Sequence, residues 1–275
     1  MRHCVFDCSF YPSGRDELKE SIQASLKNAE AVKPVPDAVS YVAPHAGYMY
    51  SGKTAAFSYR AMQSNKHMGS IDTIVIVGPN HTGRGRPISV SYEDWQTPLG
   101  ISRNDKELSK AIAGSSEYID IDEYAHEGEH SIEVQLPFLQ CLFPSKRFAA
   151  ICMGDQSIEA SAILSKAIDD ASYATRRNTL LLASSDFNHY ESAEAAKRKD
   201  SRLLGAIRAL DCKALNRLAD ELDDSACGIG PITTAMMFAL SRKARDGVVL
   251  DYSNSGDASG DYSSVVAYSA IAFVR

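Results

Sequence analysis

The chain has 275 residues, a formal net charge of −6, 44% hydrophobic and 23% charged residues, which is the balance of a soluble globular protein. It has no basic run or arginine cluster, which argues against nucleic acid as a partner, and no apolar run near the ~18 to 20 residues that span a bilayer. The N-terminus lacks an apolar signal-peptide core, and six scattered cysteines in a chain of this size favour reduced thiols and a cytoplasmic location.

Short apolar runs alternate with helical patterns along the whole chain. The expected strands lie at 38–43, 72–78, 147–153, 179–184, 247–252 and 264–273. The expected helices lie at 15–30, 52–63, 104–113, 130–142, 157–172, 192–209, 211–222 and 230–244. Because the strands are apolar on both faces and separated by helices, they predict a central, largely parallel sheet flanked by helices. With no repeat or linker, residues 1–275 are predicted to form a single α/β domain.

Two prolines indicate where helices begin. Pro137 lies inside the pattern at 130–142, so that helix should kink or start late. Pro231 fits the first turn of the helix at 230–244, where a missing N–H costs little. This places Cys227 just before a helix N-terminus.

Histidines follow three of the predicted strands. His45 follows 38–43, His81 follows 72–78, and His189 follows 179–184 together with Asp186. The carboxyl ends of parallel strands lie along one edge of an open sheet, where ligands bind. We therefore expect these side chains to converge in one crevice, whereas a single strand-end histidine would be more simply a structural hydrogen-bonding residue.

His45 and His81 suggest a metal site, since neutral imidazoles are common ligands of transition ions. Cys227 is the best candidate for a third ligand, because a helix N-terminus lowers the pKa of a thiol and the thiolate binds metal. The alternative is that Cys227 is a small buried residue in a tight turn. Cys4 and Cys8 could also pair on a metal, but no second pair completes a zinc site, and packed thiols are the simpler interpretation.

A further segment, 126–133, is rich in histidine and glutamate. His130 is a site candidate, because the first side chains of a helix can point into a crevice. Glu127 and Glu129 have a simpler explanation in the helix dipole, which favours acidic residues near an N-terminus. His126 is expected to be a surface loop residue.

The chain resembles the Memo (mediator of cell motility) family and is identified as a member of it. The matching segments run in order along nearly the whole chain: SFYPSG at 9–14, APHAGYMYSG at 43–52, VGPNHTG at 77–83, EHSIEVQLPFLQ at 129–140, SSDFNHY at 184–190, CGIGPI at 227–232 and NSGDASGDYSSVVAYSAIAF at 254–273. The resemblance implies a fold similar to that of the class III extradiol dioxygenases, which are non-haem Fe(II) enzymes. The segment HCVFDCSF at 3–10 departs from the family's small-residue pattern, a difference that should touch packing more than the site.

The resemblance also implies a ligand set. In the dioxygenases two histidines and a glutamate hold iron, whereas Memo-like proteins have two histidines and a cysteine, here His45, His81 and Cys227. Fe(II) is the expected ion, with Cu or Zn as alternatives. The side chains that the resemblance places around the same pocket are Asp186, His189 and His130. Because a thiolate is a softer ligand than a carboxylate, the analogy of fold does not establish ring cleavage.

Three functions remain open from the sequence. The first is a metal-dependent redox or dioxygenase-like enzyme in which His189, oriented by Asp186, acts as acid or base. The second is a metal-free cysteine hydrolase with Cys227 as nucleophile and His189 as base. The third is a non-catalytic protein that binds a peptide or small molecule in the same pocket. Family members are often encoded beside a radical-SAM protein, which suggests a shared pathway; no membrane partner is expected.

Overall fold

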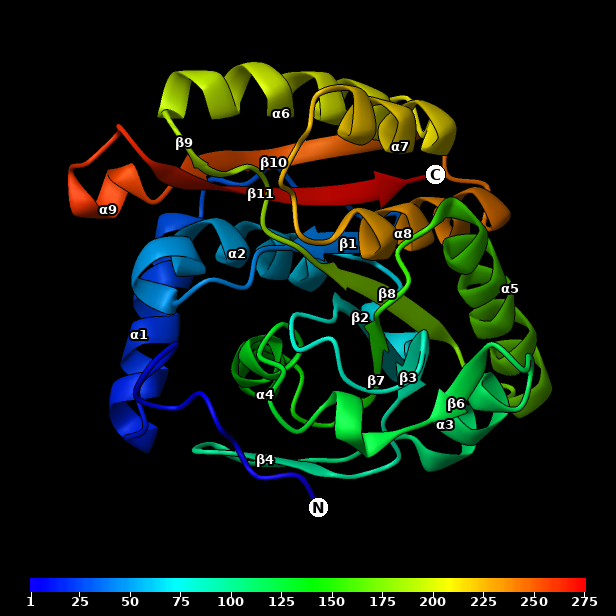
Figure 1. Ribbon diagram of the computed structural model, residues 1–275. Coiled ribbons are helices and arrows are strands. Elements are labelled where there is room, and N and C mark those ends of the chain that lie inside the picture. Colours follow the sequence, from blue (N-terminus) through cyan, green and yellow to red (C-terminus); the bar gives the residue numbers. More distant parts are fainter.

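One mixed nine-stranded sheet runs through the molecule, which the computed structural model describes over residues 1–275 (Figure 1). The strands are β1 (Ala38–Ala43), β2 (Thr73–Pro79), β3 (Ile88–Val90), β4 (Trp95–Thr97), β5 (Gly100–Ser102), β6 (Ile119–Ile121), β7 (Arg147–Met153), β8 (Thr179–Ser184), β9 (His189–Glu191), β10 (Asp246–Asn254) and β11 (Val265–Val274). The order in the sheet is β10-β11-β1-β8-β2-β7-β3-β6, with β9 added beside the start of β11, while β4 and β5 pair separately.

Helices pack on both faces of this sheet. They are α1 (Arg15–Asn28), α2 (Tyr48–Gln63), α3 (Lys106–Ala113), α4 (Leu136–Leu142), α5 (Ile158–Thr175), α6 (Ala193–Arg208), α7 (Cys212–Glu221), α8 (Ile229–Ser241) and α9 (Gly256–Ser259), with short 3-10 turns η1 (Met68–Ser70), η2 (Glu123–Ala125) and η3 (Glu133–Gln135). Each helix longer than two turns buries part of its surface against the sheet or a neighbouring helix. None of these helices combines the length and the apolar composition that a membrane-spanning helix requires.

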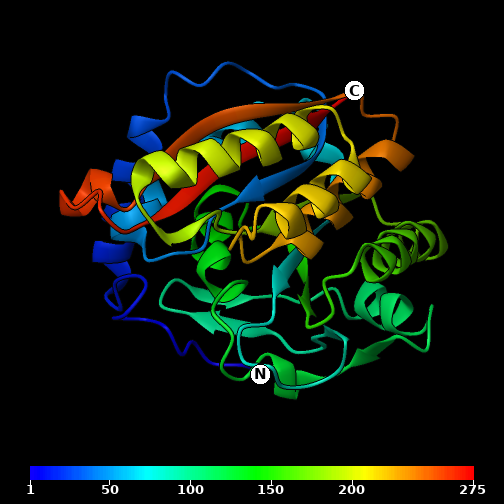
Figure 2. The same ribbon diagram turned by 45° about the horizontal axis from the view of Figure 1, so that its top comes forward.

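The two faces of the sheet carry separate hydrophobic cores. Along β2, Val75 and Val77 face the core covered by α3 and α5 to α8, whereas Ile74 and Ile76 face the core covered by α1, α2 and α4. Successive residues of a strand point to opposite faces, so a strand covered on both sides is apolar throughout. This accounts for the continuous apolar runs from which the strands are predicted, and Figure 2 shows the helices on the two sides.

The predicted α/β class with a parallel centre is confirmed. β1, β8, β2 and β7 are neighbours and run parallel. Of the strands outside them, β11 runs antiparallel to β1, β10 to β11 and β3 to β7, whereas β6 runs parallel to β3. Only residues 255–264 connect β10 to β11, and a link of that length is too short for the crossover that a parallel pair needs.

Helix starts follow the prolines. α4 begins only at Leu136, after the turn η3, with Pro137 in its first turn, so the predicted late start is confirmed. α8 begins at Ile229 with Pro231 in its first turn. α2 begins at Tyr48, four residues before the predicted start at 52, because Gly52 is a close contact with α1 rather than a helix boundary: a Cβ there would lie 3.2 Å from Ser25 Oγ.

Candidate metal centre

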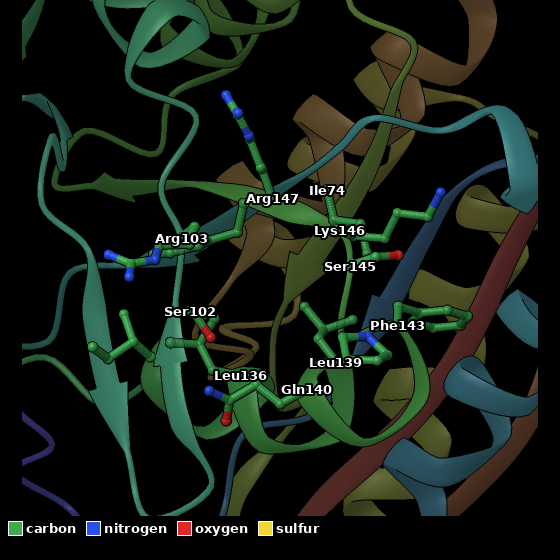
Figure 3. A pocket seen from close by; sticks show the side chains of 13 residues that line it. Ile74, Ser102, Arg103, Leu136, Leu139, Gln140, Phe143, Ser145, Lys146 and Arg147 are labelled. Atoms are coloured by element: carbon green, nitrogen blue, oxygen red, sulfur yellow. The ribbon is translucent and has the colours of Figure 1, made fainter.

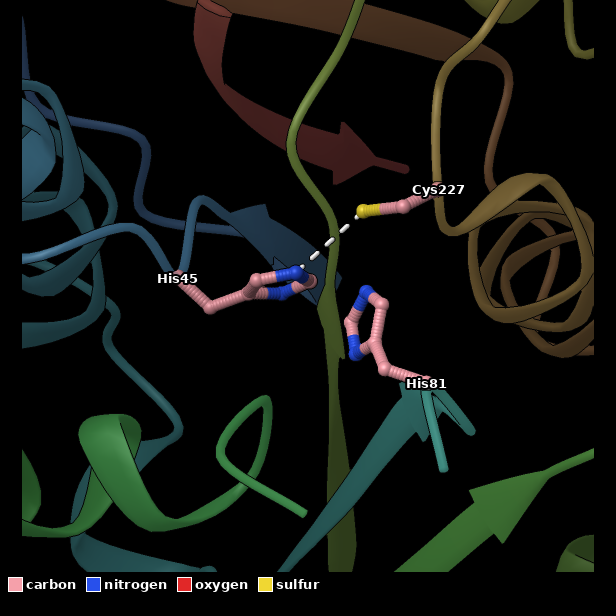
Figure 4. A group of neighbouring side chains, drawn as sticks. All are labelled: His45, His81 and Cys227. Carbon is pink, nitrogen blue, oxygen red and sulfur yellow. Dashed lines mark hydrogen bonds between the residues drawn. The ribbon is translucent and has the colours of Figure 1, made fainter. Parts of the chain in front are cut away.

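Three side chains from distant parts of the chain point toward one another at the carboxyl edge of the parallel strands (Figure 4). His45 lies two residues after β1, His81 lies two residues after β2, and Cys227 lies two residues before α8. Their potential ligand atoms all lie within 4.8 Å of one another, and His45 Nε2 is 3.2 Å from Cys227 Sγ. The fold therefore brings together the three residues that the sequence predicts as metal ligands.

The hydrogen bonds around His45 determine which ring nitrogen carries the proton. Ser184 Oγ donates its one hydrogen to the Ser131 carbonyl at 2.6 Å, so in its 2.9 Å contact with His45 Nδ1 the hydroxyl accepts and the ring donates. Burial, and then the charge of His81, lower the pKa of His45 to about 3, so the ring is neutral at pH 7. The Nε2 lone pair is thus free and directed at the Cys227 sulfur.

His81 is held in the same tautomer by Glu129. The Glu129 carboxylate accepts from the His81 main-chain N–H at 2.6 Å and contacts His81 Nδ1 at 2.9 Å. Burial alone would raise the pKa of Glu129, but the hydrogen bond and charge of His81, with the N–H of Ser131, outweigh it and lower that pKa to about 2. An ionised carboxylate only accepts, so His81 Nδ1 donates, and Nε2 is the ring nitrogen that Glu129 does not engage.

Glu129, the residue that orients His81, has a different role from the one predicted from the sequence. The helix-dipole explanation is wrong, because Glu129 lies in a loop between η2 and η3 and is completely buried. A carboxylate that orients a metal-binding histidine is a common second layer of metal sites. Glu129 also belongs to a second group with potential ligand atoms within 4.8 Å, with His81 and His130, but its oxygens already accept from His81 and Ser131. The geometry therefore fits support of His81 rather than a second ion.

Cys227 carries a thiol that is hard to ionise in the metal-free chain. Burial, and then the charge of Asp186, raise its pKa well above the usual range, so the lowered pKa expected from a helix N-terminus is wrong here. The Asp186 main-chain N–H lies 3.4 Å from Cys227 Sγ, a weak contact that does not offset burial. A metal ion is the kind of charge that displaces such a proton.

Asp186 and His189 have different partners from those expected. The predicted hydrogen bond between them is absent: Asp186 Oδ1 accepts from the main-chain N–H of His45 at 2.7 Å, and His189 Nδ1 lies 2.9 Å from the Ser225 carbonyl. A carbonyl only accepts, so His189 donates from Nδ1 to Ser225. Asp186 therefore fixes the loop that carries His45 and does not orient His189.

His130 lies beside His45 and His81, the two candidate ligand histidines. Its ring centroid is 4.6 Å from that of His81 and 5.2 Å from that of His45. Burial, and then the charge of His45, lower the pKa of His130 to about 3. On its other side the rings of Phe6 and Phe10 lie 5.5 Å and 4.6 Å away. The segment 3–10, expected to affect packing more than the site, therefore forms one wall of it.

Two other regions of the molecule contribute no residue to this centre. His126 is completely buried, 5.6 Å from the ring of Trp95, so the surface position predicted for it is wrong; the turn η2 folds it inward.

The cavity of about 160 Å³ in Figure 3 is lined by Arg103, Lys146 and Arg147 among others. It lies at the amino ends of β2 and β7, the opposite edge of the sheet from the histidines, and contains none of the candidate residues.

The sequences of known proteins match nearly the whole chain. The sequence profile of a family described as "Memo-like protein" matches residues 2–272. A "MEMO1 family protein" of Desulfurococcus amylolyticus is 43% identical, over 96% of this chain and 95% of the relative, and one of Nitrosopumilus maritimus is 38% identical over 100% of both. Among solved structures, an uncharacterized protein from Escherichia coli K12 covers 84% of this chain and 98% of its own, with a TM-score of 0.47 and 11% identity.

Proposed function

Since this chain belongs to the Memo-like protein family, we propose that it is a metal-binding protein in which His45, His81 and Cys227 hold one transition-metal ion. One observation carries the proposal: hydrogen bonds to Ser184 and to Glu129 engage Nδ1 of His45 and of His81, and the ligand atoms of both rings lie within 4.8 Å of the Cys227 sulfur. Hydrogen bonds to the second ring nitrogen accompany metal-binding histidines, and here two such rings converge on one cysteine.

The donor set selects the kind of ion. Two imidazole nitrogens and one thiolate suit Fe(II), Cu(I) or Zn(II), and they exclude Mg²⁺ and Ca²⁺, which prefer oxygen ligands. We propose Fe(II) as the resident ion, with copper and zinc as alternatives. Three protein ligands leave a coordination position for a substrate, as in catalytic rather than structural sites.

For the reaction, we propose metal-dependent redox chemistry of a dioxygenase-like kind on a substrate of undetermined identity. The ion, when bound, would polarise a substrate or exchange electrons with it. The chain itself supplies orientation and proton handling. Asp186 holds the main chain at His45. His130, whose ring lies 5.2 Å from that of His45, and His189, whose charge acts on His45, are the groups available to take or give a proton.

The metal-free hydrolase remains a second candidate, with a different base from the one first expected. His45 Nε2, at 3.2 Å, contacts Cys227 Sγ, whereas His189 Nδ1 is bonded to Ser225. The base would therefore be His45. However, a pKa near 3 for His45 and a raised pKa for the Cys227 thiol both oppose the thiolate–imidazolium pair that such an enzyme uses. This weighs against the hydrolase. The third candidate, a pocket that binds a peptide or small molecule without turnover, uses the same residues.

Metal titration tests the proposal. Protein purified without chelator or nickel resin should be titrated anaerobically with Fe(II), Cu(I) and Zn(II), with the bound metal measured by elemental analysis. We expect one ion per chain and at least ~10-fold weaker binding for Cys227→Ser. Cys141→Ser, at a half-buried cysteine on α4, is the control and should behave as wild type. Equal affinity in wild type and Cys227→Ser would remove the sulfur from the ligand set.

A further inference from the structure

One buried carboxylate gathers the first residues of the chain. Glu133 is completely buried and its Oε2 accepts from the Arg2 guanidinium at 2.6 Å. Its Oε1 accepts from the Phe6 N–H at 2.9 Å and from the Tyr11 hydroxyl at 2.6 Å, and the Val5 N–H is 3.1 Å away. Charge-assisted hydrogen bonds of this kind are about twice as strong as neutral ones, so Glu133 fixes the path of residues 2–11.

The segment 2–11, which we call the strap, is anchored at both ends. At its start the Arg2 guanidinium lies 4.1 Å from the ring centre of Trp95. At its end the Tyr48 N–H donates to the Phe10 carbonyl at 2.8 Å. Between the anchors Cys8 has a φ of 68°, a left-handed conformation that is unfavourable for a residue with a side chain. The anchors therefore impose this path; local preference does not.

The strap presents two phenyl rings to the candidate metal centre. Phe6 and Phe10 pack on each other at 5.3 Å and both pack on His130. His130 in turn lies against His81 and His45. The rings thus form a continuous aromatic layer from the strap to the ligand histidines, and this layer is apolar on the strap side.

We propose that the strap is the apolar wall of the substrate pocket and that Glu133 is the positioning residue that holds it there. Through Phe6 and Phe10 the strap sets the position of His130 beside the open coordination position. The strap also makes the site prefer metal-bound ligands that carry an apolar group over ligands that have the same donor atom and no apolar group. The preference for ligands with an apolar group rests on the proposed metal site. The role of Glu133 in holding the strap does not depend on that site.

Metal-free protein tests the holding role. In Glu133→Gln the strap amides should exchange hydrogen at least ~10-fold faster, and the fluorescence of Trp95, the one tryptophan of the chain, should change as Arg2 leaves its ring. Glu127→Gln makes the same substitution at an exposed position in the loop before η3 and should change neither. Tyr11→Phe removes one of the hydrogen bonds and should give an intermediate rate, which decides the point if Glu133→Gln does not fold. Unchanged exchange in both strap variants contradicts the proposal.

Cobalt-loaded protein tests the selection. Imidazole and 4-phenylimidazole offer the same donor nitrogen, and their binding can be followed from the Co(II) absorption bands. We expect wild type to bind 4-phenylimidazole at least ~5-fold more tightly than imidazole, since the phenyl group would bury apolar surface against the strap. Phe6→Ala, Phe10→Ala and Glu133→Gln should bring this ratio close to one, because 4-phenylimidazole loses the apolar surface that it would bury against the strap. Tyr173→Ala removes a highly exposed aromatic ring elsewhere, on α5, and should keep the wild-type ratio.

The outcomes separate the two proposals. If Co(II) does not bind, or binds equally well to Cys227→Ser, the metal site is wrong, and the exchange rates of the metal-free variants still decide whether Glu133 holds the strap. If Co(II) binds as proposed and the ligand ratio is the same in wild type, Phe6→Ala and Phe10→Ala, the metal site stands and the strap is not the substrate wall.

Discussion

The Nε2 atom of His45 lies 3.2 Å from the sulfur of Cys227, across 182 residues of sequence. In a tetrahedral site with bonds of ~2.1 Å to nitrogen and ~2.3 Å to sulfur, two such ligand atoms would be roughly 3.6 Å apart. The side chains therefore need to separate by only a few tenths of an ångström to admit an ion between them. The proposed metal site would thus need little rearrangement, and three of the four predictions below concern the residues around it.

The first prediction concerns Ser184, the residue that fixes the tautomer of His45. Ser184→Ala removes the acceptor for His45 Nδ1, so either nitrogen can carry the proton and the ring can turn. We expect metal affinity to fall by ~10- to 100-fold with the fold intact, measured by competition with a chromogenic chelator. Ser172→Ala, at a buried serine on α5, is the control. Wild-type affinity in Ser184→Ala would mean that the tautomer is set in another way.

The second prediction concerns Glu129. Glu129→Gln keeps the shape of the side chain and removes the charge that holds His81. Because a neutral amide is a weaker acceptor than a carboxylate, metal affinity should fall by ~10-fold or more. Glu127→Gln, at an exposed position two residues earlier, should bind metal as wild type does. An equal loss in both variants would point to the net charge of the loop rather than to the contact with His81.

These two supporting residues mark the limit of what the sequence can predict. His45, His81 and Cys227 are identifiable because each sits at the end of a strand or the start of a helix, and parallel strands place such ends together. Glu129 and Ser184 are 48 and 139 residues from the histidines that they orient, and no local pattern connects them. Only the fold makes these contacts.

The fold, like the candidate site, can be predicted from the sequence only in part. The central strands β1, β7 and β8 have the predicted bounds, because each is a continuous apolar run covered on both faces. β3 and β6 have three residues each and are too short for a periodic signal. The burial of His126 and the partners of Asp186 depend on tertiary contacts, so both were predicted wrongly.

The third prediction concerns acid–base stability. Burial raises the pKa of Asp200 to about 7, with smaller contributions from the charges of Asp224 and Glu191, whereas an unfolded aspartate has a pKa of ~3.9. Between these values the folded state binds the extra proton, so this contribution to stability is present below pH ~4 and is lost as pH rises through 7. By calorimetry, the Tm of wild type should fall from pH 5 to pH 8 by on the order of 5 °C more than that of Asp200→Asn.

Asp200→Asn can still bond to Tyr252, whose hydroxyl donates to Asp200 Oδ2 at 2.6 Å in wild type, because a tyrosine hydroxyl also accepts. A pH profile of Tm that is the same in wild type and Asp200→Asn would show that Asp200 is ionised in the folded protein across this range.

The fourth prediction separates an enzyme from a binding protein. His189→Gln keeps a hydrogen-bonding side chain but cannot transfer a proton, so it should retain metal and lose metal-dependent turnover by ~10²-fold or more. The assay is O₂ uptake by the Fe(II)-loaded protein with a panel of dihydroxy-aromatic compounds. His130→Gln should show the same loss if His130 is the group that handles the proton. Full activity in both variants would leave neither histidine an acid–base role, and no turnover in wild type would favour the binding protein.

X-ray absorption at the metal edge tests the central claim most directly, since it reports the atoms bonded to the ion. Wild type loaded with one equivalent of Fe(II) or Zn(II) should show one sulfur at ~2.3 Å and two imidazole nitrogens at ~2.0–2.1 Å. The sulfur should disappear in Cys227→Ser, and one imidazole should disappear in His45→Ala. A wild-type spectrum without sulfur, or one that neither substitution changes, would contradict the assignment of His45, His81 and Cys227 as the metal centre.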